Sequence, residues 1–168
     1  MSDRGEVTAV HRRYIALETV ISMIINIAFS ALFFFLVFGR SDHIDLHGFA
    51  LDYFPQTFMI TLMSVIVPTI LTRKRVNGGR LVRRGSAFGA RLPKGVILRA
   101  ILLACTACVT LGAVAVWITA SFWPAEPAHS NLLLLKLAYG AVVAAILTPI
   151  GLVAALSDDR SRGPPNNP

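Results

Sequence analysis

Apolar residues fill four long stretches of the chain, and polar segments separate them. The stretches cover residues 14–38, 54–72, 96–123 and 132–156. Each can cross a bilayer as a helix, because about 20 residues rising ~1.5 Å each span a hydrocarbon core of roughly 30 Å. The pattern therefore predicts an all-α, four-helix transmembrane bundle that forms a single membrane domain over residues 1–168.

The connections arrange the four predicted helices as two hairpins, residues 14–72 and 96–156. A shift of 81 positions lays one hairpin on the other and aligns Pro68 with Pro149. Few identities accompany this alignment, so a parallel repeat is one possibility. The third and fourth helices carry ridges of small residues, which favour close packing between them. These ridges are Ala100, Ala104, Cys108 and Gly112, and Gly140, Ala144 and Thr148.

Two further segments complete the expected layout. A short interfacial helix is expected around residues 47–53, in the connection between the first two spans. The tail over residues 157–168 is polar and rich in proline, which predicts disorder. The first apolar stretch is longer than the core of a secretory signal peptide and lacks a cleavage pattern, so we expect it to be retained as a helix.

Composition agrees with a membrane protein, and charge gives its orientation. The chain is 55% hydrophobic, has a mean hydropathy of +0.65 and is 15% charged, against ~25% charged residues in typical soluble domains. Of its 16 Lys and Arg residues, all but Arg40 and Lys136 lie in the N-terminal segment, in or just after the loop over residues 73–95, or in the tail. The positive-inside rule then predicts cytoplasmic termini and a cytoplasmic loop.

Topology thus explains the net charge of +7, which gives little support for nucleic acid as a partner. We expect the loop over residues 73–95 to contact anionic lipid headgroups, and the bundle to contact a second copy or other membrane proteins. No cofactor is predicted.

The first predicted helix carries a stripe of polar residues, Glu18, Ser22, Asn26 and Ser30, each four positions apart. Residues with this spacing share a helix face. Such a stripe serves either as hydrogen-bonding contact between helices, which we favour, or as a hydrated pathway or ligand slot.

Charged residues inside the spans are candidates for ion pairs. Glu18 and Arg99 are expected at similar depth in the first and third helices, so we hypothesise a pair, with separate snorkelling as the equal alternative. Lys136 can meet Asp52 or Glu126 at the outer side. Snorkelling of Lys136 to the outer interface is slightly favoured over either pair.

Other candidate chemistry is weak. His43, Asp45 and His47 lie together in the first outer loop and are possible metal ligands, but a solvated polar loop is the favoured interpretation. Cys105 and Cys108 form a C-x-x-C pattern inside an apolar helix, where a reactive thiolate is suppressed. No motif of a known enzyme class is present in the sequence.

The first hairpin resembles small uncharacterised bacterial inner-membrane proteins. The residues that carry the resemblance are Asp52-Tyr53-Phe54, Pro68 and Arg73-Lys74-Arg75, and it covers mainly residues 14–75. The resemblance implies no activity. A second likeness, to small multidrug exporters, rests on Glu18 in a four-helix plan. We therefore expect a non-enzymatic accessory or structural membrane component, with a small permease that uses the polar stripe as the alternative.

Overall fold

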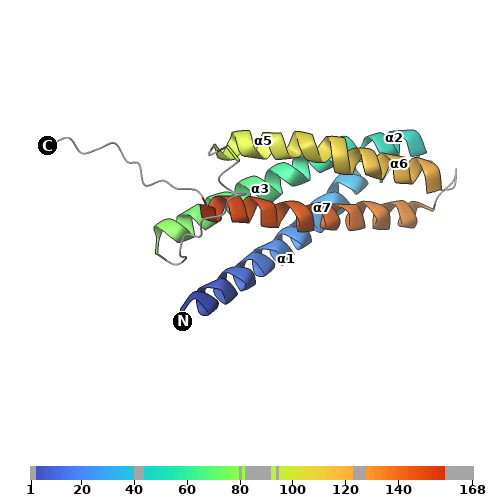
Figure 1. Ribbon diagram of the computed structural model, residues 1–168. Coiled ribbons are helices and arrows are strands. Elements are labelled where there is room, and N and C mark those ends of the chain that lie inside the picture. Colours follow the sequence, from blue (N-terminus) through green and yellow to red (C-terminus); the bar gives the residue numbers. More distant parts are fainter. Residues whose placement is uncertain are drawn as a thin grey trace.

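The computed structural model describes residues 3–39, 44–79, 81, 92–93, 95–122 and 128–157, and these form an all-helical bundle (Figure 1). Its elements are α1 (Asp3–Phe38), α2 (Leu46–Leu51), α3 (Tyr53–Asn77), α5 (Val96–Ala107), the π-helical turn η1 (Cys108–Gly112), α6 (Ala113–Phe122) and α7 (His129–Ser157). Among the described residues, four spans are long and apolar enough to cross a membrane: Ala9–Phe38, Leu46–Asn77, Val96–Phe122 and His129–Ser157. Each of the four predicted spans thus corresponds to helices of sufficient length and hydropathy.

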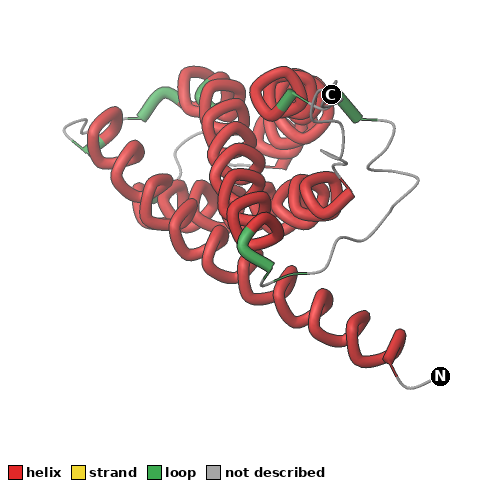
Figure 2. Tube along the Cα trace, turned by 90° about the vertical axis from the view of Figure 1, so that its left-hand side faces the viewer, coloured by secondary structure: helices red, strands yellow, loops and turns green. Residues whose placement is uncertain are grey.

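Two helices are longer than their apolar stretches. α1 begins at Asp3 rather than at residue 14, and its N-terminal end projects away from the bundle (Figures 1 and 2). α3 continues to Asn77, so the start of the predicted basic loop is helical. Hydropathy locates only the apolar part of a helix, whereas the backbone hydrogen bonds continue into polar residues outside the membrane. Of the predicted tail over residues 157–168, the structure describes only Ser157, the last residue of α7. Residues 158–168 lie outside the described residues.

The short helix expected in the first outer connection is present as α2. Its N-terminus is capped by Asp45, whose side chain accepts hydrogen bonds from the backbone N–H groups of His47 and Gly48. α2 ends at Leu51, and α3 starts at Tyr53. Asp52 therefore lies at the junction of the two helices, where it is the C-cap residue of α2 and the N-cap residue of α3.

Helix α7 lies at the centre of the packing. It packs along both α1 and α3, whereas α5 packs on α3. In the most apolar 18-residue segment of α7, 56% of the residues are buried. The corresponding segments of the spans Ala9–Phe38 and Val96–Phe122 are each 22% buried. The prediction that the third and fourth helices pack closely on each other is wrong, because α5 and α7 approach at few points.

The small-residue ridges are buried, except for the partly buried Cys108, but each faces a different helix from the one expected. A Cβ built on Gly140 would lie 2.4 Å from Ser30 Oγ of α1, and one on Gly112 would lie 3.2 Å from the Phe54 ring of α3. A ridge shows where a helix permits close approach and does not identify the neighbour. A repeat of two hairpins stays a prediction.

Candidate functional site

The polar stripe of α1 faces the interior of the bundle. Glu18 is 6% exposed, Ser22 7%, Asn26 2% and Ser30 4%. Large apolar side chains such as Leu17 and Ile24, at 59% and 62% exposed, cover the opposite face of the helix. The four predicted residues therefore share one buried face, as their spacing requires.

The middle of the stripe joins three helices through hydroxyl and amide groups. Ser64 Oγ of α3 lies 3.3 Å from Ser22 Oγ and accepts a hydrogen bond from Asn26 Nδ2 at 3.2 Å. From α7, Thr148 Oγ1 donates to Ser22 Oγ at 2.8 Å. Asn26 Nδ2 also donates to the backbone oxygen of Ser22 at 2.8 Å. This central cluster, Ser22, Asn26, Ser64 and Thr148, acts as the interhelical contact that the sequence favoured.

At the inner end, Glu18 forms its ion pair with Arg75 of α3, and not with the hypothesised partner Arg99. The Arg75 guanidinium also lies over the Tyr14 ring, 5.1 Å from its centroid. Tyr14 and Thr72 share a hydrogen bond of 2.9 Å. Arg99 is fully buried on α5, which packs against α3. Equal depth in the membrane was the basis of the Glu18–Arg99 hypothesis, and depth does not specify which helix is adjacent.

At the outer end, Lys136 and Asp52 form the ion pair that was one of the predicted alternatives. Lys136 Nζ donates to Asp52 Oδ2 at 2.7 Å. Nζ also lies 4.3 Å from the centroid of the Tyr53 ring and 4.7 Å from that of Phe49. The slightly favoured interpretation, snorkelling, is wrong because Lys136 is only 2% exposed. Glu126 lies outside the described residues.

One of the three candidate metal ligands, Asp45, lies in the loop before α2 and has a structural role. Asp45 caps α2, and the backbone N–H groups of Gly48 and His47 lower the pKa of its carboxyl group below the usual 3.8. His47 is exposed, and His43 lies outside the described residues. Within the described ranges, no group of three or more His, Cys, Asp or Glu side chains is arranged to hold a metal.

The two cysteines of the C-x-x-C pattern are free thiols beside and within the π-helical turn. Cys105 is exposed on the bundle surface, and Cys108 Sγ donates to the backbone oxygen of Phe54 on α3 at 3.4 Å. Cys108 thus makes a packing contact between helices. Its neighbour Gly112 lies against the Phe54 ring, so this turn fits closely onto α3.

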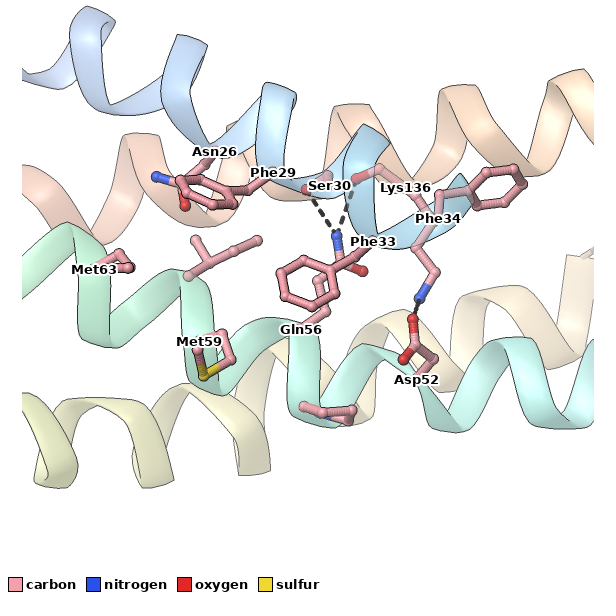
Figure 3. A pocket seen from close by; sticks show the side chains of 12 residues that line it. Asn26, Phe29, Ser30, Phe33, Phe34, Asp52, Gln56, Met59, Met63 and Lys136 are labelled. Atoms are coloured by element: carbon pink, nitrogen blue, oxygen red, sulfur yellow. Dashed lines mark hydrogen bonds and ion pairs between the residues drawn. The ribbon is translucent and has the colours of Figure 1, made fainter. Parts of the chain in front are cut away.

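A groove of about 160 Å³ lies beside the stripe, between α1 and α3, with Lys136 of α7 at one end (Figure 3). The lining residues are Asn26, Phe29, Ser30, Phe33, Phe34, Asp52, Pro55, Gln56, Met59, Ile60, Met63 and Lys136. Its walls are mostly aromatic and thioether side chains, and its polar atoms come from the stripe, from Gln56 and from the outer ion pair. The groove therefore combines the lining of a small-molecule site with a few polar groups.

Gln56 is the residue of this groove that sequence reasoning missed. Its Nε2 donates to Ser30 Oγ at 3.1 Å and to the backbone oxygen of Lys136 at 3.3 Å, so it links α3 to both α1 and α7. Its Oε1 is buried and has no hydrogen-bond partner among the described residues. An amide within an apolar span was itself a signal, since such groups are costly in lipid. Arg75 was also missed as a partner, because it was assigned to the loop.

Comparisons of the chain with protein-family models, with curated proteins and with solved structures give no match. The arrangement of the described residues is therefore the basis for any functional conclusion.

Proposed function

We propose that this chain is a non-enzymatic, accessory or structural protein of the bacterial inner membrane. One observation carries the proposal: the polar side chains of the stripe on α1 join this helix to α3 and α7. The central cluster connects α1, α3 and α7, and one ion pair lies toward each end of the bundle. Polar contacts of this kind hold transmembrane helices together and need no substrate.

The orientation in the membrane belongs to the same proposal. Both termini and the basic loop over residues 73–95 lie in the cytoplasm, where the loop binds anionic headgroups. Each successive pair of spans then starts and ends on the cytoplasmic side. The partners are a second copy of the chain or other membrane proteins.

A permease is the second candidate, because the groove lies directly beside Asn26 and Ser30 of the stripe. In that case, Glu18 would act as the proton-coupling group. The Glu18–Arg75 ion pair argues against this role, because it already uses the carboxylate as a contact between α1 and α3.

Proteoliposomes that contain a pH-sensitive dye separate the two candidates. The structural proposal predicts no substrate-dependent proton flux across a broad panel of solutes, for the native chain and for Glu18→Gln alike. Flux that disappears in Glu18→Gln, but remains in the matched carboxylate control Asp45→Asn, would overturn it in favour of the permease. Asp45 suits the control because it lies in the outer loop, away from the stripe.

Single cysteines test the orientation, after Cys105 and Cys108 have been replaced by serine. A membrane-impermeant maleimide added to intact spheroplasts should label Ser130→Cys and should spare Gly79→Cys until the cells are opened. The reverse pattern would refute cytoplasmic termini.

A further inference from the structure

Two side-chain amides that line the groove between α1 and α3 use their N–H groups on protein acceptors and leave their oxygens without a partner. Asn26 uses Nδ2 for all its hydrogen bonds, one of them to a backbone carbonyl, which can only accept. Gln56 likewise directs Nε2 to the backbone oxygen of Lys136. These carbonyls fix the orientation of each amide, so the oxygen of each amide must face away from them. Figure 3 shows the Gln56 nitrogen joined by dashed lines to Ser30 and to the backbone oxygen of Lys136.

Neither amide oxygen accepts a hydrogen bond from any of the described residues. Gln56 Oε1 is a buried acceptor without a partner. Asn26 is 2% exposed and uses Nδ2 alone for its hydrogen bonds, so its Oδ1 also remains available to a donor. A buried acceptor without a donor is costly, and the cost is recovered when a donor arrives. Both residues line the same groove, so one ligand that carries a donor can serve them.

The walls of the groove indicate that its ligand comes from the bilayer. Phe29, Phe33, Met59 and Met63 line it and remain 40–49% exposed on the outside of the bundle, where lipid lies in a membrane-spanning protein. A cavity of similar size, ~150 Å³, accommodates a benzene ring. The groove of about 160 Å³ therefore holds a head group and the first few carbons of a chain, and the rest of the chain can follow the exposed rings and thioethers.

The charges at the end of the groove select a neutral head group. Asp52 and Lys136 both line the groove, and they neutralise each other in a 2.7 Å ion pair. An ammonium head group would gain Asp52 but would meet the Lys136 cation. An anionic head group would meet Asp52 and the two amide oxygens, which cannot donate to it.

From these four observations we propose that the groove binds a neutral membrane amphiphile whose head group is a hydroxyl donor, such as a long-chain alcohol or a glyceride. The hydroxyl donates to the amide oxygens of Asn26 and Gln56, and the chain lies along Phe29, Phe33, Met59 and Met63. This site goes beyond the structural role and does not depend on it.

The test uses the full chain in phosphatidylethanolamine–phosphatidylglycerol vesicles and dodecanol that carries a diazirine on its chain. After photolysis, peptide mapping should place the label on α1 and α3 around the groove. Unlabelled dodecanol should compete at a concentration about threefold to tenfold lower than dodecyl methyl ether, which has the same chain but no donor. Dodecyltrimethylammonium and dodecyl sulfate should compete no better than the ether.

Variants provide a second measurement. Met59→Trp should reduce labelling of the groove to the level found on the lipid-facing side of α5. The matched control Ile97→Trp, at a 67% exposed position of α5, should leave groove labelling unchanged. Gln56→Leu removes one of the two acceptors and should narrow the difference in potency between the alcohol and the ether. If Gln56→Leu does not fold, the comparison of alcohol and ether in the native chain still decides. Equal competition by these two compounds, better competition by a charged amphiphile, or equal labelling of α5 would each overturn the proposal.

Discussion

Removal of the two partners of the outer ion pair should have unequal effects on stability. The Lys136 ammonium is buried, whereas the Asp52 side chain is 31% exposed. The variant Asp52→Asn leaves a buried cation without its counter-charge. The variant Lys136→Met leaves a carboxylate that still reaches solvent, and it places an unbranched apolar side chain between the Phe49 and Tyr53 rings. We therefore expect Asp52→Asn to be the more damaging change.

The magnitudes follow from the geometry of the pair. Breaking a buried ion pair on one side costs ~3–5 kcal/mol. The partial exposure of Asp52 lowers this figure, and the two rings beside Nζ continue to stabilise the cation by ~0.5–2 kcal/mol. Asp52→Asn should then reduce the free energy of unfolding by about 2–3 kcal/mol, and Lys136→Met by about 1 kcal/mol or less. The Asp52 side chain makes no capping hydrogen bond to α3. The loss of a helix cap therefore does not contribute to the difference in unfolding free energy between the two variants.

Unfolding in mixed micelles of a mild detergent and dodecyl sulfate, followed by circular dichroism, gives the free energies of unfolding. The double variant Asp52→Asn/Lys136→Met should be more stable than Asp52→Asn alone, because the second change removes the unpaired cation. Equal costs for the two single variants, or a larger cost for Lys136→Met, would show that the ammonium is not held in a desolvated site.

Two further predictions concern packing and pH. Gly140→Ala places a Cβ against Ser30 Oγ and should lower the free energy of unfolding by about 1–3 kcal/mol in the same assay. A second change, Ser30→Ala, should restore most of this loss. Full additivity of the two changes would contradict the contact. The carboxyl group of Asp45 has a lowered pKa, so its contribution to α2 should persist above the unfolded-state pKa and disappear as pH falls through the folded-state pKa. The protection factor of the Gly48 amide, which corrects for the intrinsic pH dependence of exchange, should therefore fall only at acid pH, and Asp45→Asn, which also caps helices, should remove this fall.

The helices and the buried face of α1 were predictable because both are local properties of the chain. A long apolar stretch specifies a span whatever its neighbours are, and the four-residue spacing from Glu18 to Ser30 specifies a common face. The capping of α2 by Asp45 is local in the same sense. The groove was not predictable, because it forms where α1 and α3 diverge over α7.

These local properties of the sequence do not predict which helices are neighbours. Arg75 and Arg99 are both basic residues near the inner ends of helices, so composition and depth make them equivalent as partners for Glu18. What separates them is that α3 reaches Glu18, while α5 packs on α3. The extension of α3 to Asn77 made this contact possible, and an analysis based on hydropathy ends the helix before Arg75.

In this chain, polar and small residues lie inside the bundle, and large apolar residues lie on its outside. This arrangement accounts for the central position of α7. On α3, Thr57, Thr61 and Ser64 are at most 1% exposed, while Met59 and Met63 are 44% and 42% exposed. Lipid solvates apolar side chains as well as a protein core does, so small and polar residues mark the faces where helices meet. On α7, the small residues Gly140 and Gly151 are eleven positions apart, about three helical turns, so they share one face of the helix. A Cβ on Gly140 would lie 2.4 Å from Ser30 Oγ of α1, and a Cβ on Gly151 would lie 3.3 Å from Val65 Cα of α3. One face of small residues therefore approaches α1 at one level and α3 at another, and this lets α7 pack closely on both helices.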